Sequence, residues 1–109
     1  MCIIRWYIVN TEEKVNEDKV IGDGIKTTQT SLITKGTSSE LTTEILNESE
    51  QDKYIQYVDI IFKDENGDTI DTLIGYVGQT IKSGESSYVV SDVNIDMSKT
   101  KDIEYVVHY

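Results

Sequence analysis

The sequence predicts an all-β protein, an immunoglobulin-like antiparallel β-sandwich of about seven strands that occupies residues 1–109 as a single domain. One reason is that short segments of alternating apolar and polar residues recur between turn residues. A second is the composition, which has seven tyrosines, many Ile, Val and Thr residues, and neither alanine nor proline; this favours strands over helices. A third is the length, because 109 residues suffice for one core but not comfortably for two.

The clearest strand is Tyr54–Lys63, around which the other elements are expected to assemble. Its apolar residues Val58, Ile60 and Phe62 occupy alternate positions, so their side chains share one face of an extended chain. Alternation at period two indicates a strand packed on one side rather than a helix. We expect these three side chains in the core, with Thr69–Val77 as the returning strand of a hairpin.

A polar turn, Asp64–Asp68, joins the two strands of this hairpin. Its Asn66-Gly67 pair tolerates the positive φ angles that tight hairpin turns require. The oxygen-bearing side chains also resemble the start of a calcium loop, but an EF-hand needs Gly and Glu where this chain has Thr69 and Gly75. The segment is therefore predicted to be a turn, with weak surface calcium binding as the alternative. No cofactor or metal site is expected.

The other strands are predicted from alternation between turn signals. They are Cys2–Val9, Ile25–Thr34, Glu40–Asn47, Ser87–Ile95 and Ile103–Tyr109. The acidic segment Thr11–Asp18 is interpreted as a loop and Met97–Lys101 as a polar link, and a short helical turn has room within Asp96–Asp102.

Three further core residues are expected on these strands. Leu41 and Ile45 share one face of Glu40–Asn47, and Tyr88 continues the alternation in Ser87–Ile95. Because the apolar phase shifts later in that last strand, we expect a bulge near Ser91.

The charge of the chain excludes some partners. The formal net charge is −10, which repels phosphate backbones and anionic membrane surfaces, so direct nucleic-acid binding is not expected. The apolar run Cys2–Val9 contains Arg5 and is too short to span a bilayer. It also lacks the basic start and cleavage site of a signal peptide. Membrane insertion is therefore not expected, and the only cysteine, Cys2, cannot form a disulfide within the chain.

Candidate catalytic groups are sparse. His108 is the only histidine, so a metal site there would need several carboxylates, and a nucleophilic Cys2 would need His108 as its base. No spacing supports such a pair, and Gly22-Asp23-Gly24 lacks the third glycine and the following helix of a phosphate loop. We expect no enzymatic activity and no catalytic or cofactor-binding residues, with His108 facing solvent on the last strand.

Three segments resemble the FxLYD domain, a family of small β-sandwiches. They are Leu41–Asn47, Val58–Asp64 and Ile81–Ser86, which follow the family's L-x-G-x-V-x-N strand, its aromatic-x-leucine-x-aspartate strand and its L-x-P-G-E turn. The chain departs from the family at Thr43 in place of Gly, at Ser83 in place of Pro and at Ile60 in place of the aromatic residue. The resemblance covers about residues 41–90. It implies an immunoglobulin-like domain of a bacterial exported or surface-anchored protein, without an established catalytic role.

These observations predict a non-enzymatic interaction or spacer module of a bacterial envelope or surface protein. The alternative is a small acidic inhibitor of the phage-encoded type, which mimics nucleic acid and binds a basic groove. An extracellular or envelope location follows if the family resemblance holds, and a cytoplasmic one if Met1 is the native start.

Partner-binding residues are expected on the first strand and in two acidic clusters. The first strand is apolar on both faces, so it should bind a protein partner or a second copy, or be covered by the acidic segment after it. The carboxylates would surround this surface and tune the association rate. The expected residues are Ile3, Trp6, Tyr7, Glu12, Glu13, Glu48, Glu50 and Asp52. A second apolar patch is expected if Leu46, Tyr57, Ile61 and Leu73 share one sheet.

Overall fold

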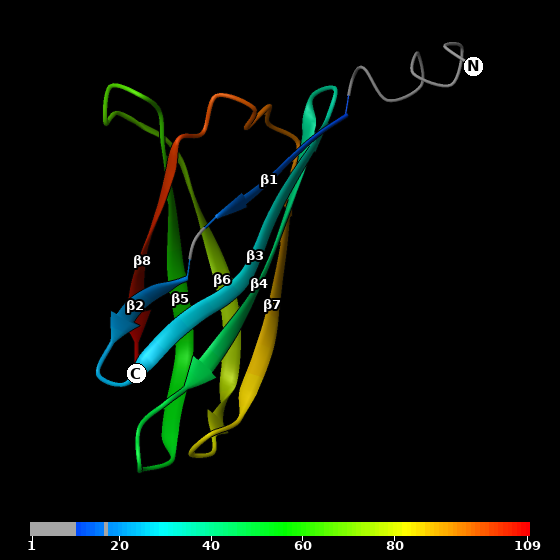
Figure 1. Cartoon of the computed structure of the whole chain (residues 1–109). Coiled ribbons are helices and arrows are strands. Elements are labelled where there is room, and N and C mark those ends of the chain that lie inside the picture. The colour runs from blue at the N-terminus through cyan, green and yellow to red at the C-terminus, as the bar shows by residue number, and fades with distance from the viewer. Residues whose placement is uncertain (1–10, 17) are drawn as a thin grey trace, which may run out of the picture.

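The computed structural model describes residues 11–16 and 18–109, and within them the chain forms eight strands and no helix (Figure 1). The strands are β1 (Thr11–Asn16), β2 (Lys19–Gly22), β3 (Ile25–Lys35), β4 (Ser38–Asn47), β5 (Lys53–Lys63), β6 (Thr69–Ile81), β7 (Ser86–Val93) and β8 (Asp102–His108). They form two sheets that face each other, so the predicted all-β sandwich is confirmed (Figure 1).

The two sheets are antiparallel throughout. The larger sheet has the order β1-β3-β4-β7, with β2 also paired to β3, and the smaller sheet has the order β6-β5-β8. The predicted hairpin is therefore the β5–β6 pair, and β8 joins it on the other edge of β5. Strands β6 and β7 meet where the chain passes between sheets, and there the Gln79 amide donates a hydrogen bond to the Ser87 hydroxyl at 2.8 Å.

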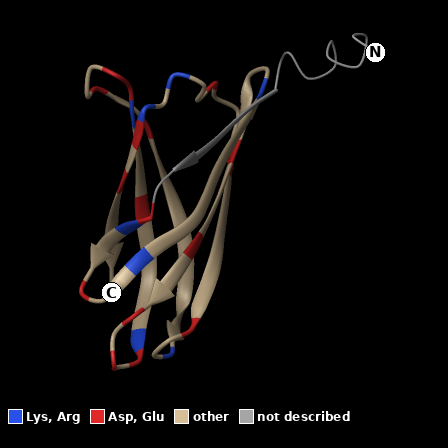
Figure 2. Cartoon of the chain, viewed as in Figure 1, with Lys and Arg blue, Asp and Glu red and all other residues tan. Residues whose placement is uncertain are grey.

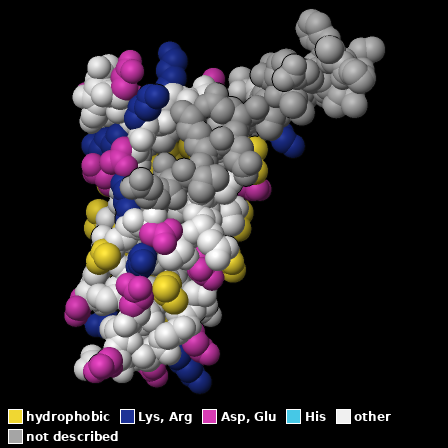
Figure 3. All heavy atoms as spheres, in the orientation of Figure 1, with side chains coloured by type: hydrophobic (Ala, Val, Ile, Leu, Met, Phe, Trp, Pro, Cys, Tyr) yellow, Lys and Arg dark blue, Asp and Glu magenta, His cyan; other side chains and the backbone are white. Residues whose placement is uncertain are grey.

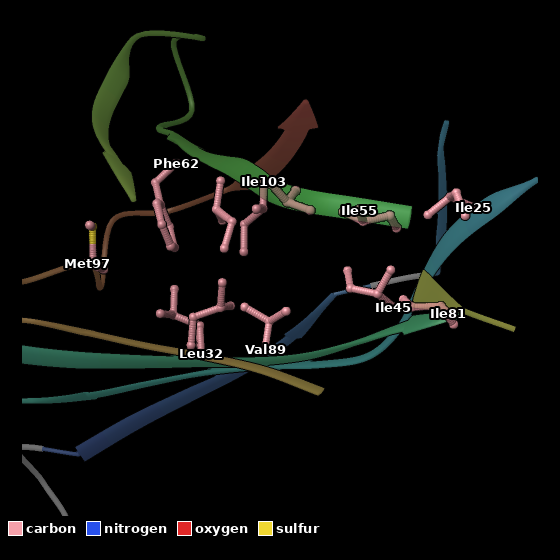
Figure 4. Packing of buried hydrophobic residues seen from close by; sticks show 12 residues of the cluster. Ile25, Leu32, Ile45, Ile55, Phe62, Ile81, Val89, Met97 and Ile103 are labelled. Carbon is pink, nitrogen blue, oxygen red and sulfur yellow. The ribbon is translucent and has the colours of Figure 1, made fainter. Parts of the chain in front are cut away.

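The core lies between the sheets and is built from inward side chains that alternation predicted (Figure 4). Val58, Ile60 and Phe62 of β5 are at most 1% exposed, and Leu41 and Ile45 of β4 belong to the same buried cluster. These five predictions are confirmed. Full burial of one such side chain stabilises the fold by about 1.5–3 kcal/mol. The other buried apolar residues of the cluster are Ile25, Leu32, Ile55, Ile81, Val89, Met97 and Ile103.

The predicted phase of β7 is wrong. Tyr88 is 57% exposed, whereas its neighbour Val89 is 3% exposed and belongs to the core. The register of β7 with β4 runs without interruption from Ser39↔Val93 to Leu46↔Ser86, so there is no bulge near Ser91. Because β4 turns its odd-numbered residues inward, the odd-numbered residues of β7 that lie opposite them also face the core.

The interpretation of Thr11–Asp18 as a loop is also wrong, because its first six residues form β1. This strand pairs with β3 from Thr11↔Lys35 to Asn16↔Thr30. The edge of β3 offers backbone N–H and C=O groups that need hydrogen-bond partners. A polar segment can pair with them, because these bonds are made by the backbone and not by apolar side chains. The predicted strand Cys2–Val9 lies outside the described residues. Residues 96–102 contain a turn closed by the Thr100 amide and the Met97 carbonyl, but no helix.

Candidate interaction surface

Outward side chains of the smaller sheet lie side by side in rows that run across the strands. The reason is that Tyr57, Asp59 and Ile61 of β5 are each paired with one residue of β6 and one residue of β8. Tyr57 of β5 is paired with Tyr76 of β6 on one side and with His108 of β8 on the other. The rings of Tyr57 and His108 are stacked, with centroids 4.2 Å apart and planes inclined by 17°. The ring of Tyr76 lies 6.2 Å from that of Tyr57 at an inclination of 51°. One row of three aromatic rings therefore crosses the whole sheet.

A hydrogen bond fixes His108 within this row. Its Nε2 atom lies 2.8 Å from Oδ2 of Asp59, and with a proton on Nε2 the imidazole donates to the carboxylate. The two side chains are 36% and 29% exposed, so the pair lies half-buried at the surface. His108 is on the predicted face of β8, but its contacts with Asp59 and Tyr57 were not foreseen. Alternation places both partners on the outer face of β5, yet nothing in the sequence pairs β5 with β8.

Aliphatic side chains extend the row into an apolar surface. Ile74 and Val106 are 46% and 45% exposed, and the register places them on either side of Asp59. Tyr76 is 75% exposed. We call the following six residues the aromatic face: Tyr57, Ile61, Ile74, Tyr76, Val106 and His108. The larger sheet packs against the opposite side of the smaller one, and no strand of residues 18–109 covers the aromatic face (Figure 1).

The apolar patch expected from the sequence is only half correct. Tyr57 and Ile61 belong to the aromatic face, but Leu73 packs against the core and Leu46 lies on the larger sheet. For Leu73 the reason is the pairing of β6 with β5. The register pairs Leu73 with the inward-facing Ile60, which turns Leu73 inward as well.

The outer face of the larger sheet combines exposed Tyr88 and Val90 with polar side chains that bond to one another. The carboxylate of Glu44 accepts hydrogen bonds from the hydroxyls of Thr28 at 2.6 Å and Ser86 at 2.8 Å. These bonds, the one from Thr28 first, lower the pKa of Glu44. The hydroxyl of Tyr88 lies 3.2 Å from the amide oxygen of Gln29. On the side of the molecule seen in Figure 3, hydrophobic side chains are scattered among polar and charged ones.

The two acidic clusters expected at one surface lie apart. Glu48, Glu50 and Asp52 are in the β4–β5 connection, whereas the Glu12 and Glu13 backbones lie on β1 beside the β3–β4 hairpin, at the other end of β4. Figure 2 shows acidic residues at both ends of the sandwich. The side chains of Glu12 and Glu13 and all of Ile3, Trp6 and Tyr7 lie outside what the structure describes.

Contacts within the chain already engage two carboxylates of the described cluster. Glu48 lies 3.8 Å from the Lys26 ammonium group. Asp52 accepts a hydrogen bond from the backbone amide of Ser83 at 3.0 Å. Glu50 is exposed, so it is the member of this cluster that is best placed to meet another molecule.

The Asp64–Asp68 segment is the hairpin turn that the sequence predicted. The Asp64 carboxylate accepts hydrogen bonds from the backbone amides of Asn66 and Asp68, at 2.9 and 3.0 Å. Only Gly67 has a positive φ in this turn, at 82°. Among the described residues no group of three or more His, Cys, Asp or Glu side chains is arranged to hold a metal ion. The same residues contain no helix with the length and apolar character needed to cross a membrane.

A buried phenol lies between the sheets. The hydroxyl of Tyr105 is enclosed beside Thr27, Thr30 and Thr43, but makes no hydrogen bond of normal geometry with any described residue. Burial raises the pKa of Tyr105, and the neighbouring threonine hydroxyls offset this only in part. Because the hydroxyl has no access to the surface, we treat it as part of the core and not as a reactive group.

Comparison of the chain with known protein families, with curated proteins and with solved structures finds no match.

Proposed function

We propose that this chain is a non-catalytic interaction module of a bacterial envelope or surface protein, and that it binds a folded protein partner through the aromatic face. The observation that carries the proposal is the ordered row Tyr76–Tyr57–His108 on an uncovered sheet. Aromatic residues are enriched at the centres of protein interfaces, where they supply large contact areas. Exposed apolar surfaces of this kind mark interaction sites.

Contacts within the chain hold two side chains of this row, Tyr57 and His108, before a partner binds. Tyr57 is stacked on His108, and His108 is bonded to Asp59, so these side chains lose little rotamer freedom when a partner arrives. Ordering a mobile side chain at an interface costs about 0.5–1.5 kcal/mol. A preorganised row avoids much of that cost, which favours a binding role over a purely structural one.

Charge indicates the chemistry of the partner. The chain has a net charge of −10. The exposed Glu104 is paired directly with Ile61 and lies two residues before Val106 on β8, so it borders the aromatic face. A partner with an apolar centre and a rim of Lys and Arg residues would be attracted, whereas a second copy would bring another −10 to the interface. We therefore expect a basic partner, and a monomer when the protein is alone.

A photo-reactive phenylalanine at position 76 tests the proposal in the source bacterium. Its matched control is the same residue at position 88, because Tyr88 is similarly exposed but lies on the larger sheet. Position 76 should cross-link to one basic protein, and position 88 should not. The purified partner should then bind the wild-type chain, more weakly at high salt, and fail to bind an Ile74→Asp variant. Equal cross-linking at both positions, or full binding by Ile74→Asp, would refute the role of the aromatic face.

The net charge also favours a second candidate, the acidic inhibitor that mimics nucleic acid. For that function the contacts should come from carboxylates, and Glu50 is the exposed member of the described cluster. Cross-linking from position 50 to a nucleic-acid-binding enzyme, with loss of that enzyme's activity, would select the inhibitor. Cross-linking from position 76 alone would select the interaction module.

A further inference from the structure

The turn between β5 and β6 contains the one Asn-Gly pair of the chain, Asn66-Gly67. It projects from one end of the sandwich, where it joins the two strands (Figure 1). Residues 65–69 are exposed, and the side-chain amide of Asn66 makes no hydrogen bond with another described residue. Water therefore reaches an amide group that no described neighbour holds in place.

Asparagine is a chemically labile residue, because its side chain can react with the backbone of the residue that follows it. The following nitrogen bonds to the side-chain carbon Cγ, which closes a five-membered succinimide ring. The side-chain amide group leaves as ammonia and takes the proton of the attacking N–H group. Water then opens the ring at one of its two carbonyls and gives aspartate, or isoaspartate, in which the backbone runs through Cγ. Water is the only co-reactant, and one carboxylate replaces one amide.

Gly67 leaves room for this attack. Its φ angle is 82°, a conformation that residues with a side chain rarely adopt, so the turn favours glycine at this position. A Cβ atom at position 67 would meet no atom within 4 Å apart from its chain neighbours. Nothing therefore crowds the nitrogen, either from its own side chain or from the rest of the described fold. The pair that permits the tight turn is also the pair that favours ring closure.

Hydrogen bonds to Asp64 oppose the reaction. The N–H group of Gly67 donates to the Asp64 carbonyl at 3.0 Å. Oδ1 of the Asp64 carboxylate accepts from the backbone amides of Asn66 and Asp68, at 2.9 and 3.0 Å. For ring closure the Gly67 nitrogen must leave its partner and turn toward Cγ of Asn66, so the turn has to open. The turn is exposed, and water can replace each of these bonds when it does.

We propose that Asn66 is a site of spontaneous deamidation in the folded protein, and that the Asp64 carboxylate sets the rate. The product is one charge more negative and has a new carboxylate beside those of Asp64, Glu65 and Asp68. Isoaspartate also adds a backbone atom to the turn, which the amide of Asp64 and the carbonyl of Asp68 close at 2.9 Å. Aged protein therefore differs from fresh protein at this end of the sandwich. The reaction involves only the turn and water, so it is independent of the proposed function.

Peptide mapping of the intact protein after incubation at mildly alkaline pH tests the proposal. Trypsin releases peptides 64–82 and 83–99, which contain Asn66 and Asn94. Asn94 is also exposed, but the branched side chain of Ile95 follows it and hinders attack. Mass spectrometry should find aspartate and isoaspartate at position 66 and unchanged Asn94, and ion exchange should separate a more acidic form. The matched control Asn66→Gln keeps an amide but needs a six-membered ring, so it should yield no such form.

Two variants of Asp64 test what sets the rate. Asp64→Ala removes both bonds to Oδ1 and should convert about five times faster than the wild type, the factor that one typical hydrogen bond contributes to an equilibrium constant. Asp64→Asn keeps an Oδ1 acceptor and should convert at the wild-type rate, and circular dichroism should show that both remain folded. Wild-type protein that keeps Asn66 until urea unfolds it would overturn the proposal, as would equal conversion at Asn94. Conversion of Asp64→Ala at the wild-type rate would overturn the role of Asp64.

Discussion

Replacement of Asn47 by Ala should destabilise the sandwich strongly, because it removes a buried hydrogen-bond network at the end of β4. The side chain is fully buried at the end of β4. Its amide group donates to the carbonyls of Gln51 and Ile81, both at 2.8 Å. Its Oδ1 atom accepts from the backbone amide of Ser49 at 2.9 Å and from the Ser49 hydroxyl at 2.6 Å. Asn47 thereby ties the β4–β5 connection to the end of β6.

The magnitude follows from these four bonds. Each contributes about 1 kcal/mol net, and the buried Ile81 carbonyl loses more because water does not replace its partner. Gln51 and Ser49 are more exposed and regain part of their bonding from water. We expect Asn47→Ala to lower the free energy of unfolding by about 3 kcal/mol. With an m-value of about 1.5 kcal/mol/M, the urea midpoint would fall by about 2 M.

Urea unfolding followed by circular dichroism measures this loss, with two matched variants. Asn66→Ala changes the same residue type in the exposed β5–β6 turn and should cost less than about 0.5 kcal/mol. Asn47→Asp keeps the acceptor oxygen but sets a second carboxylate oxygen against the Gln51 and Ile81 carbonyls, so it should cost at least as much as Asn47→Ala. A loss below about 1 kcal/mol for Asn47→Ala, no larger than that of a surface substitution, would refute the reasoning.

Three further predictions concern the core and are measured by the same unfolding assay. Phe62→Ala should cost about 3–5 kcal/mol because the ring is fully buried, whereas Tyr88→Ala should cost less than about 1 kcal/mol; similar losses would contradict the observed phase of β7. Gly75→Ala should cost about 1–3 kcal/mol, since the added methyl group would collide with Val89, and an unchanged midpoint would show that the sheets can separate there. Tyr105→Phe should raise stability by about 1 kcal/mol by removing an unpaired hydroxyl. Burial raises the pKa of Tyr105 in the folded chain. Above about pH 10 the unfolded chain therefore binds fewer protons than the folded one, and the free energy of unfolding should fall as the pH rises. This fall should be less steep in Tyr105→Phe than in the wild type.

Local sequence determined the fold class and most of the inward-facing residues. Period-two alternation is a property of the extended backbone, so Val58, Ile60 and Phe62 had to share a face wherever β5 was placed. The same argument correctly assigned Leu41 and Ile45. The turn at Asp64–Asp68 was also predictable, because its hydrogen bonds and its one positive φ, at Gly67, lie within the segment itself.

Alternation could not choose between two phases that are equally apolar. In β7 alternation allows either Tyr88 and Val90 or Val89 and Val93 to face the core, and only the pairing with β4 selects Val89. Strand β1 was missed for a related reason. Its polar residues have no strand signal of their own, and it forms because β3 offers an open edge.

The aromatic face is a product of tertiary structure. The sequence placed Tyr57 and Asp59 on the outer side of β5, but His108 lies 49 residues after Asp59. Their contact exists only because β8 pairs with β5, and at that separation backbone hydrogen bonds and shared burial select the partner strand. Side-chain pattern determines which way a residue points within its strand, whereas strand pairing determines which residues it meets.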